Sequence, residues 1–315
     1  MNKIALVACL VFGAMIACVS CNKESNYAGL EDISFTNYPK VDGSTSARAL
    51  NQMVACKILG ARYEWVLGLS EEWRIDAKDI FPKNFENFLI ERIQSSQTHG
   101  AFINLLEGNA DIIITHRTIS PDEAEFAELV GVTLIETPIA SDAFVFVVHP
   151  NNPVKSLTID EIQKIYTGEI TNWSEVGGND AAINAYSRPR NSGSEEVFRT
   201  LLMDGLEPDD FLNELEINSM HEVFHAIEND VNSICYTFRN YAEVIARRSD
   251  IPKIAINGIY SDDKTIENRT YPFVSAMYVA IRSDLDPNSM AYKLYEWLRS
   301  DKAKSTFIEC GFLPK

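Results

Sequence analysis

The chain has 315 residues, of which 46% are hydrophobic and 23% charged, and its formal net charge is −17. This length suggests one large domain or two lobes, and the hydrophobic fraction excludes a disordered or low-complexity chain. The acidic balance argues against nucleic acid and lipid headgroups as partners, because both are recognised mainly through Lys and Arg. Taken alone, it also argues against a small anion as ligand.

The first twenty residues have the pattern of a targeting segment. Lys3 is followed by the uncharged run Ile4–Val19, which is shorter than the roughly 20 residues of a bilayer span. The run ends in small residues before Cys18 and Cys21, and this resembles a bacterial lipoprotein signal, whose cysteine is acylated. Cys21 is preferred because a polar stretch follows it, as in Bacteroides-type lipoproteins, and Cys18 is the alternative. An ordinary secretory signal with incidental cysteines also remains open.

This pattern predicts a signal peptide over residues 1–20 and a flexible tether over residues 21–37. We therefore expect an extracytoplasmic monomer in the bacterial periplasm or cell envelope, attached to the membrane through its lipid anchor alone. The three cysteines further along, Cys56, Cys235 and Cys310, form no metal or disulfide pattern and are expected in the core.

After the tether, short apolar runs alternate with helical patterns. Strands are expected at 111–115, 132–135, 143–149, 182–186, 234–238, 253–256 and 277–282. Helices are expected at 47–59, 100–107, 159–167, 195–203, 220–228 and 289–299. The alternation predicts an α/β fold with largely parallel sheets, whereas residues 60–97 show no clear period.

Three predicted helix starts carry the same chemistry: Val41–Ser46 (VDGSTS), Ser95–Gly100 (SSQTHG) and Arg188–Glu195 (RPRNSGSE). Hydroxyl side chains stand where free backbone N–H groups and the positive end of the helix dipole favour an anion. Gly43 permits a tight turn and Gly193 a close backbone approach, while Ser192 and Glu195 have capping-box spacing. Each site alone fits an ordinary N-cap. Together, with Arg188 beside them, they indicate a cradle for a tetrahedral oxyanion.

Residues 39–313 resemble the phosphate-binding periplasmic proteins of ABC importers, in a Gram-positive and Bacteroides-type branch. The motifs are Val41–Ser46, Gly108–Arg117, Ser156–Gly178, Ile183–Phe198 and Glu309–Lys315, in the family's order. The resemblance implies a two-lobed type II binding-protein fold with the ligand cleft between the lobes. It implies a lobe I of 38–140 plus 271–315 and a lobe II of 141–270. It also implies a non-catalytic lipoprotein without cofactors that captures an oxyanion, foremost phosphate, for an importer permease. A sensor or surface lipoprotein of the same fold is the alternative.

Carried over residue by residue, the resemblance implies a set of ligand contacts from three loops and one strand end. These are Ser44, Thr45, Ser46, Thr98, His99, His116, Arg117, Arg188, Ser192, Gly193 and Ser194. Two positions depart from the family pattern, since His116-Arg117 stand where a proton-accepting carboxylate is usual and Arg190 stands where an acid is usual. A neutral His116 would still accept a proton-bearing oxygen. Alternatively, these changes favour a fully ionised oxyanion or a carboxylate.

One competing motif points to zinc. His221-Glu222-Val223-Phe224-His225 spells HExxH, in which two histidines one helical turn apart bind zinc and the glutamate activates water. No third ligand motif follows it, so a surface helix is expected, with a zinc metalloprotease as the remote alternative and His221 and His225 as weak metal candidates. No nucleophile motif is present, and His99, His116 and His149 lie apart in sequence from any obvious Ser or Cys partner.

Overall fold

The computed structural model describes residues 30–68, 72–78, 85–190, 192–209 and 214–315. The expected signal peptide, both candidate acylated cysteines and the first part of the expected tether lie outside these described residues. Within them, no helix is both long enough and apolar enough to cross a membrane.

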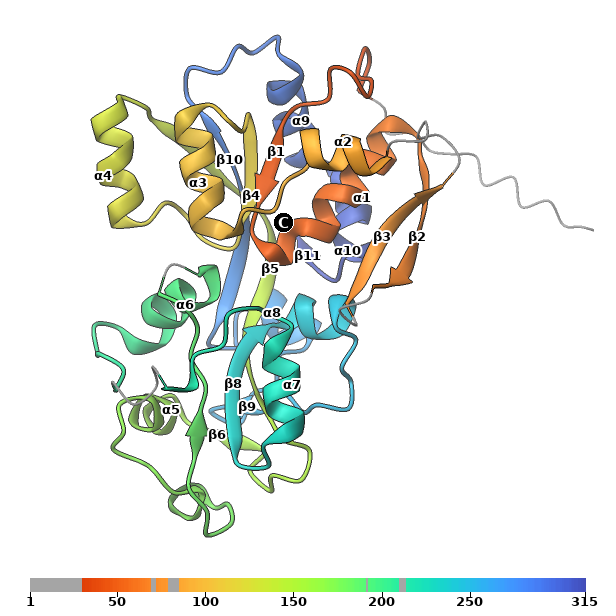
Figure 1. The fold of residues 1–315 in the computed structure, drawn as a ribbon. Helices are drawn as coiled ribbons and strands as arrows, with labels where there is room; N and C mark the ends of the chain where they lie inside the picture. Colours follow the sequence, from red (N-terminus) through yellow and green to blue (C-terminus); the bar gives the residue numbers. More distant parts are fainter. Residues whose placement is uncertain (1–29, 69–71, 79–84, 191, 210–213) are drawn as a thin grey trace, which may run out of the picture.

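Two lobes share one mixed β-sheet (Figure 1). Its strand order is β1-β4-β10-β5-β8-β7, and β11 pairs with β5 beside this path. The strands are β1 Val41–Gly43, β4 Ile112–Thr115, β5 Leu134–Val148, β7 Asn184–Ala185, β8 Ser233–Phe238, β10 Val274–Arg282 and β11 Leu313–Pro314. Two smaller sheets pair β2 Arg62–Leu67 with β3 Trp73–Lys78, and β6 Ser156–Leu157 with β9 Ala255–Ile256.

Helices cover the sheet in both lobes (Figure 1). In the upper lobe, called lobe I, they are α1 Arg48–Leu59, α2 Phe85–Arg92, α3 Gln97–Glu107, α4 Pro121–Val130, α9 Met290–Leu298 and α10 Lys304–Glu309. In the lower lobe, called lobe II, they are α5 Ile159–Tyr166, α6 Gly193–Phe198, α7 Glu222–Asn229 and α8 Asp263–Glu267. Short 3-10 or π turns are η1 Thr45–Ala47, η2 Trp173–Val176, η3 Arg199–Met203, η5 Tyr241–Ile245 and η6 Asp301–Ala303.

The expectation of largely parallel sheets is wrong. β1·β4, β7·β8 and β6·β9 are parallel, but β5 pairs antiparallel with β10, β8 and β11, and β10 pairs antiparallel with β4. The reason is that β5 runs from lobe I into lobe II as one continuous strand of 15 residues, with no helical crossover. Its polar middle, around Pro138 and Asp142, separates the two apolar runs that predict two strands at 132–135 and 143–149.

The six expected helices are all present, with shifted ends. α3 begins at Gln97, three residues before the expected start, and the segment 195–203 is α6 followed by a π turn. The segment 60–97 without a clear period holds the β2–β3 hairpin and α2. This hairpin pairs outside the main sheet and both its faces are partly exposed, so its side chains have no reason to alternate strictly.

Aromatic side chains fill the core of lobe II. Phe198 stacks on Tyr236 with ring centroids 4.6 Å apart, and Phe144 and Phe146 of β5 pack against the same tyrosine. Trp173 is buried and donates its indole N–H to Asn232 O at 2.8 Å. The three cysteines expected in the core are buried and free: Cys56, Cys235 and Cys310.

Gly43 lies where β1 approaches β4 most closely. A Cβ at this position would overlap the carbonyl oxygen of Ile114, which accepts a hydrogen bond from the Ser44 N–H at 3.1 Å. We expect Gly43→Ala to lower the free energy of unfolding by about 1–3 kcal/mol, measured by denaturant titration. In Gly100→Ala the new Cβ meets a Ser96 side-chain carbon at 3.1 Å, so this helical control should change stability by about 1 kcal/mol or less. Equal stability of the two variants would contradict the close-approach argument.

Candidate functional site

A small polar cavity of about 30 Å³ lies where the two lobes meet. Its lining residues are Ser44, Thr45, Ser46, Gln97, Thr98, His116, Arg188, Ser192, Gly193, Ser194, Met220 and Phe238. Nine of these twelve belong to the set expected from the sequence, and they come from all three predicted helix starts. The fold therefore brings together segments that are about 150 residues apart in the chain.

The first loop follows β1 and enters α1 through a 3-10 turn. Ser44 and Ser46 are buried, and their Oγ atoms lie 3.1 Å apart. The hydroxyl of Ser44 makes no N-cap hydrogen bond, although it occupies the cap position. These hydroxyls therefore face the cavity instead of the helix backbone.

A buried carboxylate joins the first loop to the second. Asp42, which is 1% exposed, accepts hydrogen bonds from Gly43 N at 2.7 Å, Ser96 N at 2.9 Å and Asn104 Nδ2 at 2.7 Å. Three donors satisfy its charge without a cation. Asp42 therefore sets the spacing of the two loops, a role that the sequence analysis missed because the partners are 54 to 62 residues away.

The second helix start contributes Thr98 to the cavity wall, but not its neighbour His99. Thr98 is buried against the cavity, whereas His99 Nδ1 lies 3.0 Å from Glu123 Oε1. Arg117 also turns away from the cavity, because its two terminal nitrogens each donate to Glu123 at 2.7 Å. Glu123 is fully buried and needs this counter-charge. The structure therefore leaves His99 and Arg117 outside the cavity, in contrast to the expectation.

His116 does have a serine partner. Its Nδ1 lies 2.8 Å from Ser46 Oγ, its Nε2 lies 3.3 Å from Asp142 Oδ2, and its ring stacks on Phe238 with centroids 3.9 Å apart. A carboxylate only accepts hydrogen bonds, so Nε2 donates to Asp142 Oδ2, and in a neutral ring Nδ1 would accept from the Ser46 hydroxyl. The serine is 70 residues away in the chain, which is why the separation of His116 from serine in sequence was misleading.

Arg188 is the cation of the cavity. The residue is only 6% exposed, and its Nη2 donates to Asn218 O at 3.2 Å, while Nε and Nη1 have no hydrogen-bond partner. Burial lowers the pKa of the guanidinium, and the nearby groups Cys235, Tyr236, Glu222 and Glu195 oppose this shift. Two buried donors thus remain available beside the hydroxyl groups.

The third helix start presents α6 to the cavity. Ser192 Oγ accepts from Glu195 N at 3.2 Å and lies 3.4 Å from Ser194 Oγ. The Glu195 carboxylate does not return to the cap: it accepts from Arg199 Nε at 2.8 Å and from the Tyr236 hydroxyl. Burial raises its pKa, and those hydrogen bonds oppose the shift. The capping-box prediction is therefore correct for the Ser192 side chain, which caps the helix, and wrong for the Glu195 side chain, which does not.

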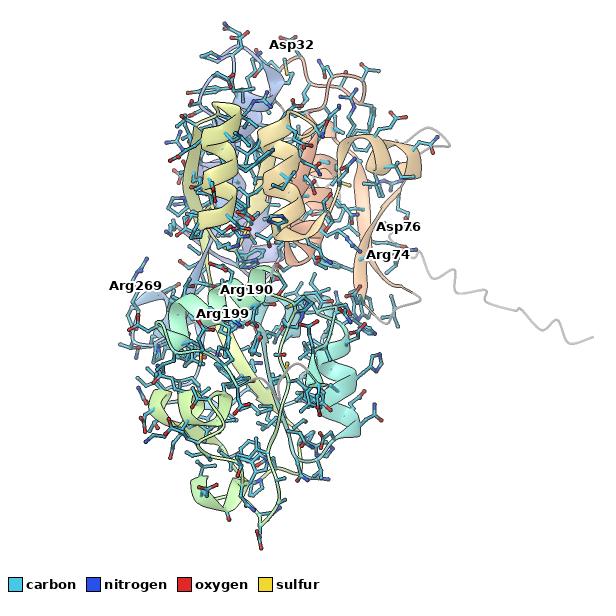
Figure 2. The ribbon with its side chains drawn as sticks, turned by 60° about the vertical axis from the view of Figure 1, so that its left-hand side comes forward. Asp32, Arg74, Asp76, Arg190, Arg199 and Arg269 are labelled. Carbon is cyan, nitrogen blue, oxygen red and sulfur yellow. The ribbon has the colours of Figure 1, made fainter. Side chains whose placement is uncertain are left out.

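Arg190 is exposed and does not line the cavity, although Figure 2 shows it near the level where the lobes face one another. The presence of an arginine at position 190, where the family pattern has an acid, therefore adds no charge at the cavity wall. Gln97, Met220 and Phe238 complete the wall, and the sequence offered no signal for them.

The HExxH segment is α7 with the residue before it. The Nε2 atoms of His221 and His225 lie 2.7 Å from each other, and Glu222 accepts from Asn218 N at 2.8 Å. In the described part of the chain, no group of three or more His, Cys, Asp or Glu side chains is placed to hold a metal ion. The glutamate therefore acts as a cap at the start of the helix, next to the loop that contacts Arg188.

The chain is similar in sequence to two proteins that are named as phosphate-binding. Phosphate-binding protein PstS of Bacillus subtilis is 25% identical over 182 residues, which span 58% of each chain. The protein of the same name from Borreliella burgdorferi is 26% identical over 207 residues, covering 64% of this chain and 71% of that protein. The match to the Bacillus protein thus spans less than two thirds of that relative.

Two solved structures share the fold. A substrate-binding protein from Clostridium perfringens with bound phosphate has a TM-score of 0.65 at 21% identity, covering 89% of this chain and all of that one. An ABC-type phosphate transport receptor from Vibrio cholerae has a TM-score of 0.62 at 22% identity, covering 88% of this chain and all of that one. The family model of the PBP superfamily domain matches residues 75–302, most of the described chain. The chain therefore belongs to the PBP superfamily.

Proposed function

We propose that this protein is an extracytoplasmic, lipid-anchored solute-binding protein that captures phosphate and delivers it to the permease of an ABC importer. The observation that carries the proposal is the buried Arg188 guanidinium, whose Nε and Nη1 have no protein partner and lie in a cavity lined by serine and threonine hydroxyls. Among the described residues, no carboxylate lines this cavity, so a bound anion would supply the counter-charge of Arg188. The names of the relatives support phosphate as that anion.

Ser46 and His116 favour an oxyanion that carries a proton. With a neutral His116 ring, Ser46 donates its hydrogen to Nδ1, and the lone pairs of Ser46 Oγ are left to accept a hydrogen from the ligand. Hydrogen phosphate has such a hydrogen near neutral pH, and sulfate does not. The hydrogen bond from His116 to Asp142 maintains this direction of donation. We therefore favour phosphate over a fully ionised oxyanion.

Capture would proceed by closure of the two lobes, with boundaries at 38–140 plus 271–315 and at 141–270. Ser44, Thr45 and Thr98 come from lobe I, whereas Arg188 and Ser194 come from lobe II, so only the closed arrangement supplies all donors. The chain crosses between the lobes within β5 and again just before β10, and these two crossings would act as the hinge (Figure 1). The protein performs no chemistry on the anion, and a micromolar affinity needs about −8 kcal/mol.

The first test is Arg188→Ala, measured by isothermal titration with phosphate. We expect the heat of binding to disappear, because the variant removes the buried cation and both unpartnered donors. Arg190→Ala, an exposed arginine in the same loop, is the matched control and should bind within about twofold of the parent protein. Unchanged binding by the Arg188 variant, or binding of sulfate in preference to phosphate, would refute the proposal.

The second test addresses closure at Gly193. A Cβ on this residue of lobe II would overlap Thr98 Oγ1 of lobe I. Gly193→Ala should therefore weaken phosphate binding by about tenfold or more, equivalent to about 1.4 kcal/mol, without lowering the thermal midpoint of the unliganded protein. Adding Thr98→Ala would remove the overlapping Oγ1 atom, and Thr98→Ala alone gives the separate cost of losing this hydroxyl. Full affinity in Gly193→Ala would show that the lobes do not need this contact.

The third test addresses the anchor. In cells fed an alkyne-tagged fatty acid, Cys21→Ala should abolish labelling of the protein and Cys18→Ala should leave it intact. The reverse pattern would assign acylation to Cys18. Labelling of neither parent nor variant would contradict the lipoprotein assignment and favour a plain secretory signal.

A further inference from the structure

A second cavity of about 460 Å³ opens between the lobes beside the phosphate cavity. His116 is the lining residue that the two cavities share, so the second cavity has its own walls. Lobe I contributes the segment 116–121 that leads into α4, α6 and the turn after it contribute residues of lobe II, and β10 forms the back. Its size is in the range of cavities that hold small organic molecules.

Two exposed cations, Arg269 and Lys315, line this cavity. Neither forms an ion pair with an Asp or Glu side chain of the described residues, whereas Arg117, which also lines the cavity, is paired with Glu123. Burial, and after it the positive charge of Arg269, lowers the pKa of the Lys315 ammonium, so the two cations are close enough to repel. Figure 2 shows Arg269 at the edge of the molecule, at the level where the lobes meet.

The backbone of Arg269 is also unusual. Its φ is 58°, in the left-handed region that non-glycine residues rarely occupy. The turn is fixed by hydrogen bonds from Arg269 N to Ile266 O at 3.2 Å and from Tyr271 N to Thr265 O at 3.0 Å. These contacts hold the arginine at the cavity rim in a conformation that costs about 1 kcal/mol or more.

A buried hydroxyl inside the cavity has no partner. Ser275 on β10 is 7% exposed, lines the cavity, and its Oγ makes no hydrogen bond. A buried hydroxyl left unpaired costs about 1–3 kcal/mol. The remaining wall is mixed: Ile119, Val197, Val274 and Tyr278 are among its apolar residues, and Glu196 is the carboxylate on its lobe II side. The cavity thus combines a cationic rim, a wall of mixed polarity and one unpaired hydroxyl.

We propose that this cavity binds a small organic acid, whose carboxylate lies at Arg269 and Lys315 and whose apolar body fills the space next to Ser275. A hydroxyl or carbonyl oxygen of the ligand pairs with Ser275 Oγ. The carboxylate of the acid pairs with the two exposed cations, and the apolar part of the wall distinguishes the acid from an inorganic ion. This site goes beyond the proposed phosphate function and does not depend on it.

Because both lobes contribute to the wall, an acid in this cavity favours the lobe arrangement in which the wall is complete. That arrangement is the one in which the phosphate cavity is also assembled. Linkage then requires phosphate and the acid to raise each other's affinity by the same factor. The two ligands bind at once and do not compete.

The experiment uses the whole protein with saturating phosphate and three probes: hexanoate, 2-oxoglutarate and 4-hydroxyphenylacetate. Saturation-transfer NMR followed by isothermal titration should find at least one probe that binds with a stoichiometry of one. Arg269→Gln combined with Lys315→Gln should weaken that probe by about tenfold or more, as expected for lost charge-assisted hydrogen bonds. Ser275→Ala should weaken the two oxygen-bearing probes and leave hexanoate unchanged.

Lys40→Gln combined with Lys302→Gln is the matched control, since it removes the same charge from exposed positions outside the cavity lining. This control should bind the probe within about twofold of the parent protein. Arg188→Ala should lose phosphate and bind the probe with the affinity that the parent protein shows without phosphate, which separates the two sites. Binding of none of the probes, displacement of the probe by phosphate, or equal weakening in the control would overturn the proposal.

Discussion

The site depends on a guanidinium that the fold buries without an ion pair. Arg188 has one hydrogen bond from its side chain, to a backbone carbonyl, and the nearest carboxylates are engaged elsewhere: Glu195 with Arg199 and Tyr236, and Glu222 with backbone N–H groups. A buried guanidinium without a carboxylate partner destabilises the unliganded protein. It also leaves the two free donors of Arg188 in place, so little rearrangement is needed when an anion arrives.

The shared strand explains why such a site lies between two lobes. β5 pairs with β10 at its start and with β8 at its end, so one strand belongs to the sheet of both lobes. Asp142, near the middle of this strand, contacts His116, and its Oδ1 accepts from Asn240 N at 3.2 Å. Asp142 in the hinge region therefore also positions the His116 imidazole, which contacts Ser46. Through these contacts the strand that crosses between the lobes is connected to the wall of the cavity.

The net charge of −17 and an anion site are compatible because they act over different distances. Exposed charges are screened over about 8–10 Å at physiological ionic strength. The donors of the cavity act at hydrogen-bond distance in a buried space, where water does not compete. Charged residues near the site are also paired away from it, as Arg117 and His99 are with Glu123. Net charge therefore says little about a buried cavity, although it still argues against nucleic acid.

By itself, the sequence determined the six expected helices, the α/β class, the buried cysteines and the three helix starts that line the cavity. It could do so because capping residues, apolar periods and hydroxyl clusters are local signals. α4 was missed even though Ser120, Pro121 and Glu123 form a proper helix start, so that signal was available. Only the tertiary structure decided the strand directions, the partners of His116 and the departure of His99 and Arg117 from the cavity. Those outcomes depend on contacts such as Ser46 with His116 and Arg117 with the buried Glu123, in which burial and charge pairing select one partner among many. The hydrophobic periodicity of the sequence does not show which partner each of these side chains has in the folded protein.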